Sequence, residues 1–454
     1  MANKSRINYK SISAFVIIMF LAILARVWWI NNIPLEPVFD FETYYKVATN
    51  YYEGKGLSYT YEKDGVAYEK PWAFQAYGYP LTMGTFFKIM GNSEVYTAKV
   101  LNVILSSISL VFIFFILKKI IKNKKLMWGL FIATAFLPNY IAYNNVLGSE
   151  ILSVFMFSLL ICCTLYIDDI KSSKLRYKAL ILLGLICGCA AIVKPYFMAY
   201  PVILIVTEWM RNKDIKNILL YIVTVLIGFS TILGCSIAKN YKDFGMFIPI
   251  SYNGGYVSFI NNNSLNTKGG WINVAKVPIS EKGLKALEEV GYDFYVDAQT
   301  EKMQSFQNPK VSPILKKEAL NWMNNHPLEF IELGLLRVVN VFFSGANDVS
   351  MWCLENIGEF SNSGIRWAKI FLGIAEITVS VLVFAGIVFI LMNLKKLFVA
   401  LVKDSLDKKT SLMCLSILFF VAVFFVLEGQ ARYNFPTLFL FMATLGMLCD
   451  KNLD

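Results

Sequence analysis

Long apolar stretches dominate the pattern of hydrophobic and polar positions along the 454 residues of the chain. Ten of them carry few or no charges and approach the length of about 20 helical residues that crosses the hydrocarbon core of a bilayer. They cover residues 11–30, 98–117, 126–145, 150–167, 179–193, 195–210, 218–237, 370–392, 411–427 and 435–449. The pattern predicts an all-α polytopic membrane protein with about ten (ten to twelve) transmembrane helices.

Two long polar stretches, residues 31–94 and 239–364, separate these runs. In the second, we expect short strands within residues 239–307 and helices at residues 313–324 and 327–343. The last helix places one apolar stripe along its length, which is typical of a lateral amphipathic helix on a membrane surface or against spans. Its members are Leu328, Ile331, Leu335, Val338 and Phe342.

The chain therefore divides into three parts. An N-terminal transmembrane module covers residues 1–238 and includes the first loop, 31–94. A segment with the lateral helix covers residues 239–365, and C-terminal transmembrane helices cover residues 366–454. We expect the two polar stretches to contribute juxtamembrane helices and a small external cap.

Composition and charge agree with a membrane protein. Hydrophobic residues make up 56% of the chain and charged residues only 17%, against about 25% charged in a soluble domain. This excludes soluble enzymes, disordered proteins and disulfide-stapled secreted domains. The eight Cys lie mostly in apolar runs and the one His is isolated, so we expect neither a disulfide framework nor a zinc site.

The net charge of +11 comes from Lys and Arg that gather in alternate loops. These loops lie at residues 118–125, 171–178, 211–216 and 395–409, on the same side as the basic N-terminus. Basic loops stay cytoplasmic, so we expect both termini in the cytoplasm, a retained first span and both polar stretches outside a plasma membrane, most simply a bacterial one. The distribution argues against nucleic acid as a partner.

Two carboxylates just beyond the first span are the first candidate for chemistry. Asp40 and Glu42 open a predicted helix that runs to about Tyr52, stops at Gly54 and carries Tyr45 on its aromatic face. On the structural interpretation, Asp40 only caps this helix. On the functional one, the two side chains form a catalytic or metal-binding pair, in which a carboxylate beside apolar surface takes up a proton.

The same loop ends in an aromatic turn, residues 70–81, that contains Lys70, Tyr77 and Tyr79. Two prolines and a glycine make this turn rigid. It is either an aromatic belt at the membrane interface or a platform for a sugar, whose C–H faces suit flat rings.

An ordered series of motifs along nearly the whole chain resembles the membrane glycosyltransferases of the GT-C superfamily. The branch it resembles is that of protein O-mannosyltransferases and aminoarabinose transferases, glycosyltransferase families 39 and 83. The series comprises Arg26, Asp40-Phe41-Glu42, Gly54-Lys55-Gly56, Gly78-Tyr79-Pro80-Leu81, Ser149-Glu150, Lys194-Pro195, Lys239-Asn240-Tyr241, Asn253-Gly254-Gly255, Asn325-His326-Pro327 and Glu428-Gly429-Gln430-Ala431-Arg432-Tyr433. Lys194 departs from the Arg common in relatives, so a bidentate grip on phosphate is lost there.

The resemblance implies an enzyme that takes a sugar from a polyprenyl-phosphate-linked donor and passes it, with inversion, to an acceptor outside the membrane. Asp40 would be the base and Glu42 its partner. The acceptor would be a protein, a lipid or a wall polymer.

The donor phosphate needs positive charge at the outer boundary, and the topology places Lys194, Arg432 and Lys70 there. Snorkelling to the interface is the structural alternative for Lys194 and Arg432. Glu150 would hold the sugar or one of these cations, unless it only favours a helix N-terminus. The resemblance adds Tyr79, Tyr433, Tyr77 and Tyr45 as substrate-binding side chains. We expect Arg337 to pair with Glu332 or Glu329.

No cofactor is predicted, and a divalent cation stays open because two carboxylates are too few ligands to argue for one. A lipid or glycan transporter or flippase is the main rival function. An oligosaccharide polymerase or ligase and a membrane scaffold are further rivals. Transporters more often show repeats and broken spans near the midplane, whereas the polar candidates here gather at loops and span ends.

Overall fold

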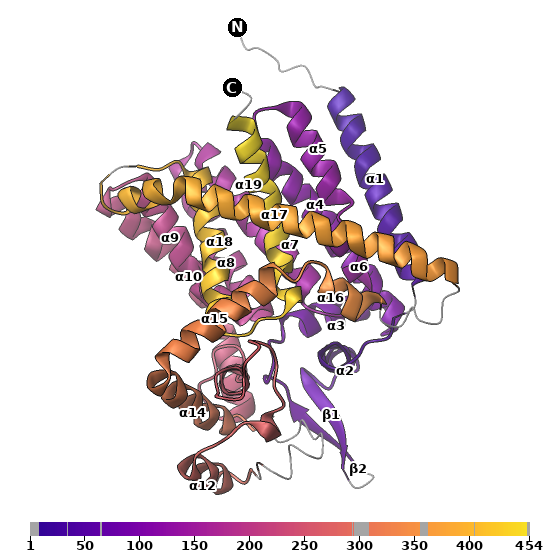
Figure 1. Ribbon diagram of the computed structural model, residues 1–454, viewed down its shortest axis with the longest axis vertical. Helices are drawn as coiled ribbons and strands as arrows, with labels where there is room; N and C mark the ends of the chain where they lie inside the picture. Colours follow the sequence, from indigo (N-terminus) through magenta and orange to yellow (C-terminus); the bar gives the residue numbers. More distant parts are fainter. Residues whose placement is uncertain are drawn as a thin grey trace.

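The computed structural model describes residues 9–451 except 34, 64–65, 293, 295–307, 355–361 and 404, and most of these residues lie in helices. Seven helices are long and apolar enough to cross a membrane. They are α1 (Tyr9–Asn32), α4 (Val95–Ile120), α7 (Glu150–Tyr166), α8 (Ser173–Val193), α10 (Ile215–Phe244), α17 (Asn362–Val402) and α18 (Lys408–Val426). Most of them run side by side in a bundle, whereas α17 crosses its front obliquely (Figure 1).

The remaining three predicted spans correspond to shorter helices. Helices α5 (Lys124–Ala135) and α6 (Pro138–Ala142) form a pair bent by 43°, which makes up to eight spans among the described residues if the pair counts as one. Helices α9 (Tyr200–Arg211) and α19 (Leu438–Lys451) have 12 and 14 residues and pack within the bundle. The helical polytopic architecture is thus confirmed, and the count of ten to twelve spans stays a prediction.

Glycines allow α8 and α10 to pack closely. A Cβ atom on Gly184 would lie 2.1 Å from the carbonyl oxygen of Val225, and one on Gly228 would lie 2.1 Å from that of Ile181. Both distances are well inside van der Waals contact, so any side chain at these positions separates the helices. Small residues serve the same purpose in other membrane bundles.

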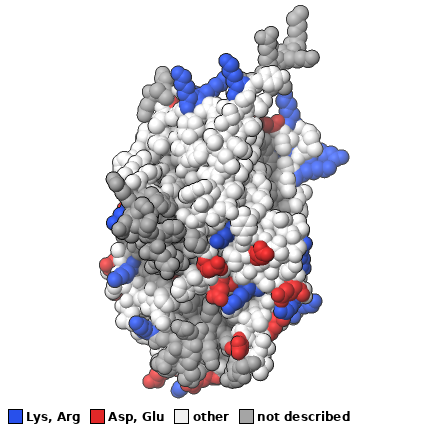
Figure 2. All heavy atoms as spheres, turned by 90° about the vertical axis from the view of Figure 1, so that its right-hand side faces the viewer, with Lys and Arg blue, Asp and Glu red and all other residues white. Residues whose placement is uncertain are grey.

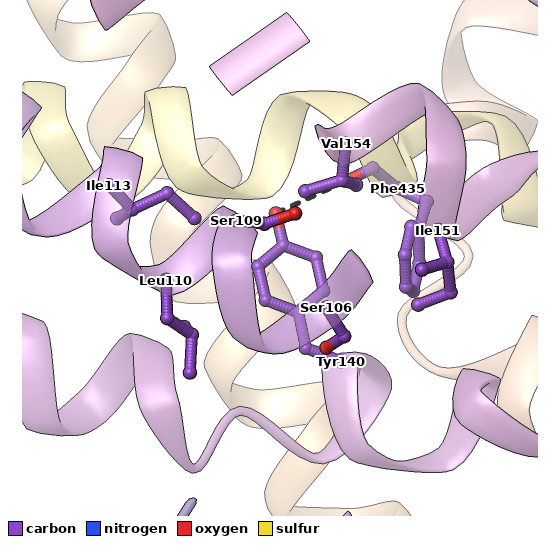
Figure 3. A pocket seen from close by; sticks show the side chains of 8 residues that line it. All are labelled: Ser106, Ser109, Leu110, Ile113, Tyr140, Ile151, Val154 and Phe435. Carbon is purple, nitrogen blue, oxygen red and sulfur yellow. Dashed lines mark hydrogen bonds between the residues drawn. The ribbon is translucent and has the colours of Figure 1, made fainter. Parts of the chain in front are cut away.

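Arg26 supports the break in the bent pair. Its side chain is fully buried; Nη1 donates to the carbonyl oxygens of Ala22 and Ala135, both at 2.9 Å, and Nε donates to Ser106 Oγ at 2.8 Å. Ala135 ends α5, so the arginine satisfies a carbonyl that the break leaves without a helical partner. A small cavity lies beside Ser106, and Tyr140 Oη there donates across it to the carbonyl oxygen of Phe435 at 3.3 Å (Figure 3).

Ion pairs join the basic loops at one end of the bundle. Lys119 pairs with Asp169 at 2.7 Å, and Asp168 pairs with Lys408 at 3.0 Å and with Arg211 at 3.5 Å. The first and last described helices, α1 and α19, also begin and end here (Figure 1). Figure 2 shows one face on which Lys and Arg gather at this end, above a belt nearly free of charged side chains.

The opposite end carries the polar stretches. The first holds α2 (Asp40–Tyr52), the antiparallel strands β1 (Ser58–Lys63) and β2 (Val66–Pro71), and α3 (Gly78–Met90). The second holds α11 (Gly254–Asn261), α12 (Glu281–Glu289), α14 (Val311–Asn325), α15 (Pro327–Phe342) and α16 (Asn347–Val349). Helices α11, α12 and α14 share a small hydrophobic core of their own.

At this end, the structure confirms some local predictions and contradicts another. The helix from Asp40 to Tyr52 and the two later helices are confirmed, with Gly54 at a φ of +86° after the first. The short strands expected within residues 239–307 are not found in its described part, and the hairpin β1–β2 lies instead in the first loop. Strand β2 is exposed along its length.

Helix α15 corrects one further prediction. Of its predicted apolar stripe, Leu328, Ile331 and Leu335 are exposed and Phe342 is buried, which is compatible with a lateral helix on a membrane surface, so that placement stays a prediction. Arg337, in contrast to expectation, does not pair with Glu332 or Glu329. It is buried on the other face, where Nη1 donates to the carbonyl oxygen of Phe425 at 3.0 Å and Nη2 donates to Asn262 Oδ1 at 2.9 Å. Arg337 therefore ties α18 to the segment after α11.

Candidate functional site

Asp40 lies at the start of α2, at the junction between the bundle and the polar end. Phe39 rather than Asp40 is the N-cap residue, and the described hydrogen bonds of the Asp40 carboxylate go to side chains and not to helix amides, so Asp40 does not only cap the helix. Its Oδ1 accepts a hydrogen bond from Gln75 Nε2 at 2.8 Å, and its Oδ2 lies 3.2 Å from Arg432 Nη2. The preceding residue, Phe39, has a φ of +51°, a conformation that is strained for an aromatic residue.

The aromatic turn presents Gln75 to Asp40. The backbone amides of Tyr252 and Asn253 donate to the carbonyl oxygens of Ala73 and Phe74, both at 3.0 Å. Two separate polar stretches of the chain are thereby held together beside the site. Gln75 itself is buried, so its amide reaches Asp40 from a fixed position.

Arg432 occupies the short helix η8 (Ala431–Thr437) before α19 and is almost completely buried. Its guanidinium carbon lies 5.4 Å from the ring centroids of Phe41, Trp352 and Tyr433. Trp352 also meets Phe41 edge-on at 5.1 Å. The rings fix the direction of the guanidinium and strengthen its electrostatics by excluding water.

A second ion pair lies next to the first. Lys194 Nζ lies 3.2 Å from Glu150 Oε1 and 5.6 Å from the centroid of the Tyr433 ring. Tyr433 Oη donates to Glu428 Oε2 at 2.8 Å. One tyrosine ring thus contacts both cations and is itself anchored by a carboxylate.

Tyr44 joins the two pairs on the side of α2. Burial raises the pKa of Tyr44 above its ordinary value, and the carboxylates of Asp40 and Glu150 raise this pKa further. Its hydroxyl therefore stays protonated at neutral pH, so it can donate one hydrogen bond and its oxygen can still accept others.

Other predicted residues lie apart from these pairs. Glu42 is exposed and pairs with Lys46 at 2.6 Å, and Tyr45 Oη donates to the carbonyl oxygen of Ser93 at 2.7 Å. Lys70 lies on the exposed strand β2 with its ammonium 5.4 Å from the Tyr61 ring. Their predicted roles remain predictions, without a contact to Asp40 or Arg432 among the described hydrogen bonds and ion pairs.

Tyr77 and Tyr79 contact residues next to the site rather than the two ion pairs themselves. Tyr79 is fully buried, donates to Asn102 Oδ1 at 3.0 Å and meets the Tyr44 ring edge-on at 6.0 Å. Lys239 Nζ lies 4.9 Å from the centroid of the Tyr77 ring.

Sequence reasoning missed Gln75, Trp352 and Glu428 as members of the site. Gln75 and Glu428 stand inside motifs that the sequence singles out, and only their polarity among aromatic or apolar neighbours marks them. Nothing in the sequence around Trp352 connects it with Arg432. For a metal ion, the described residues contain no group of three or more His, Cys, Asp or Glu side chains.

The site brings together a carboxylate open to solvent on one side, two buried cations and a wall of aromatic rings. Asp40 is 37% exposed, whereas the side chains of Arg432 and Lys194 are only 9% and 15% exposed. Such a set can hold an anionic group on the cations and accept a proton at the carboxylate.

No model of a known protein family matches the sequence, and no curated protein sequence matches it. Solved structures of an oligosaccharyltransferase from Archaeoglobus fulgidus are similar in fold. One, tethered with an acceptor peptide that contains the NVT sequon, matches with a TM-score of 0.50 and 12% identity over 97% of this chain. Another, AglB in complex with an inhibitory peptide and a dolichol-phosphate, matches with a TM-score of 0.51 and 13% identity, also over 97%.

The chain spans about half the length of these neighbours, 49% and 50%. At such low identity the likeness concerns the fold and does not distinguish between branches, so the branch of families 39 and 83 stays a prediction. AglB has the GT-C fold of membrane glycosyltransferases. On this likeness, and on the ordered motifs of its sequence, the chain has the GT-C fold.

Proposed function

We propose that the protein is a membrane glycosyltransferase that moves a sugar from a polyprenyl-phosphate donor to an acceptor on the extracytoplasmic face. The contact between Asp40 and Arg432 at 3.2 Å carries the proposal, because a carboxylate can serve as a base and a guanidinium can bind phosphate. The site lies at the end of the bundle opposite the basic loops, which supports an extracytoplasmic position.

Arg432 and Lys194 would bind the donor phosphate. Each is paired with a carboxylate, Asp40 or Glu150, at 3.2 Å. A phosphate that reaches Arg432 competes with Asp40 for the guanidinium. Phosphate binding would thereby weaken the ion pair and make the Asp40 carboxylate a better proton acceptor.

Asp40 would then accept the proton of the acceptor hydroxyl or amide. The acceptor oxygen or nitrogen forms a bond to the anomeric carbon while the bond from that carbon to the phosphate oxygen breaks. The electron pair leaves with the lipid phosphate, whose charge Arg432 and Lys194 stabilise. Attack from the side opposite the phosphate inverts the anomeric carbon. Gln75 holds the Asp40 carboxylate in place at 2.8 Å.

The acceptor would approach between the bundle and the polar end, where Asp40 is open to solvent. The neighbour structures were solved with an acceptor peptide and with a dolichol-phosphate. They support a lipid-linked donor and make a protein the first acceptor to test, ahead of a lipid or a wall polymer.

A donor assay with purified protein in nanodiscs tests this proposal. Radiolabelled polyprenyl-phosphate sugars are supplied with membranes or peptides as acceptors, and we expect Asp40→Asn to lower transfer by about 10²- to 10⁴-fold. Glu53→Gln is the matched control and should keep most activity, because Glu53 is exposed, pairs with Lys55 and has no predicted role in the site. Movement of labelled lipid across proteoliposomes that is equal in wild type and Asp40→Asn, with no transfer, would favour a flippase instead.

A further inference from the structure

Asp348 is a buried carboxylate that the mechanism above does not use. It lies on α16 with an exposed fraction of 2%. Burial raises the pKa of Asp348 to about 6 against the lowering influence of the Tyr143 hydroxyl and the Val349 amide, yet neither carboxylate oxygen makes a hydrogen bond of ordinary geometry with a described residue. A buried carboxylate with such incomplete pairing is costly, which indicates that something absent from the free protein interacts with it.

The position of Asp348 connects it with the proposed site. Helix α16 packs against η8, which carries Arg432. Four residues after Asp348, Trp352 lies with its ring 5.4 Å from the guanidinium of Arg432. One short segment therefore covers the phosphate-binding cation and supplies the carboxylate.

Further polar atoms without partners lie between Asp348 and the second ion pair. The groups that act electrostatically on Tyr143 include Asp348, Cys353, Glu150 and Arg432. Within the described part of the chain, the Tyr143 hydroxyl, Glu150 Oε2 and Arg432 Nε are buried without a hydrogen bond. Unsatisfied buried groups are rare in folded proteins, so several of them within electrostatic reach of Tyr143 point to a missing ligand.

The chemistry of these atoms selects the ligand. Ionised carboxylates only accept hydrogen bonds, so the ligand must donate them. A metal ion is disfavoured, because no cluster of three acidic, His or Cys side chains occurs in the described residues. In a sugar phosphate, hydroxyl donors lie within a few bonds of the phosphate that Arg432 would hold, and the rings of Phe41, Trp352 and Tyr433 suit its C–H faces.

We propose that Asp348, together with Tyr143, forms a subsite that accepts a hydrogen bond from one hydroxyl group of the donor sugar and thereby selects the sugar. This inference rests on the proposed function. Asp348 is a specificity-determining residue on this view, while Asp40 remains the base. Glu150 Oε2 accepts from a second hydroxyl of the same sugar.

The test uses full-length protein in nanodiscs and the polyprenyl-phosphate sugar that wild type transfers, together with its monodeoxy analogues. We expect one analogue to lose about 10- to 100-fold in kcat/KM with wild type, as for a hydrogen bond to a charged group. With the parent sugar, Asp348→Leu should lower kcat/KM by the same factor relative to wild type. With that analogue, Asp348→Leu should lower kcat/KM no further. Asp348→Asn, which keeps an acceptor oxygen, should recover part of the loss.

Stability provides a second readout. Removal of an unpaired buried charge should raise the unfolding temperature of the sugar-free protein by about 2 °C or more in Asp348→Asn. Glu53→Gln, an exposed carboxylate paired with Lys55, is the control and should change neither selectivity nor stability.

Two results would overturn the inference. One is that Asp348→Leu lowers transfer equally for the parent sugar and every analogue. The other is that Asp348→Leu leaves the discrimination of wild type intact. Both are distinct from failure of the proposed function, in which wild type itself transfers no sugar from any donor.

Discussion

The pair of Lys194 and Glu150 allows the cost of a buried charge to be measured separately from catalysis. Lys194 Nζ and Glu150 Oε1 are 3.2 Å apart, their side chains are 15% and 4% exposed, and Glu150 Oε2 has no other partner among the described residues. Lys194→Met therefore leaves a buried carboxylate without a counter-charge.

The expected loss follows from this geometry. Coulomb's law at 3.2 Å with an effective dielectric constant of 20 gives about 5 kcal/mol. Desolvation offsets part of that gain, so we expect Lys194→Met to lower the free energy of unfolding by about 3 kcal/mol. At about 2 °C per kcal/mol this corresponds to a fall of about 6 °C in the unfolding temperature.

The assay is thermal unfolding of detergent-purified variants followed by tryptophan fluorescence. The double variant Lys194→Met/Glu150→Gln should regain most of the loss, because the unpaired charge is gone. Lys46→Met breaks the exposed pair with Glu42 and should change stability by less than about 1 kcal/mol. The single variant Glu150→Gln completes the comparison. If the losses of unfolding free energy in Lys194→Met and Glu150→Gln simply add in the double variant, the reasoning about an uncompensated charge is wrong.

Three further predictions concern other parts of the chain. Gly184→Leu should separate α8 from α10 and lower the yield of folded protein, read by size-exclusion chromatography, because a Cβ atom there already meets Val225 at 2.1 Å. Arg337→Lys should speed proteolysis of the segment after α11, because one ammonium cannot bridge the carbonyl oxygen of Phe425 and Asn262; unchanged cleavage would contradict this. The raised pKa of Asp348, about 6, means that the folded state holds its proton more tightly than the unfolded chain. Stability should therefore fall by up to about 3 kcal/mol between pH 4 and 7, and Asp348→Asn should abolish that part of the pH dependence of unfolding.

The sequence predicts the spans from its apolar runs, and it predicts part of the site from the polar residues that interrupt these runs. Long apolar runs predict helices without help from the fold, so seven of the ten predicted spans are found as long helices and the other three as shorter ones in or near their expected ranges. Asp40, Arg432, Lys194 and Glu150 stand at polar breaks in those runs, and the structure brings them together in two ion pairs.

Other features depend on contacts between distant segments and escape a local pattern. The position of Arg337 on α15 is one of them, because it lies on the buried face with Leu333 and Val341 and meets segments far away in the sequence instead of the nearby glutamates. Glu42 is two residues from Asp40 on a helix, so its side chain points to a different face and is exposed to solvent. Trp352 and Arg432 are far apart in the sequence, and only the folded structure brings the ring close to the guanidinium.

Arg26 has a consequence for how the chain enters the membrane. A charged side chain in a span costs about 2.5–3.5 kcal/mol at insertion, and the partners of Arg26 outside its own helix come 80 and 109 residues later, at Ser106 and Ala135. During synthesis the first span must wait, with its charge unsatisfied, until α4 and α5 have left the ribosome. The first helix can therefore reach its final contacts only once α4 and α5 are present. A foreign apolar helix in its position would insert more easily yet leave the end of α5 without its donor.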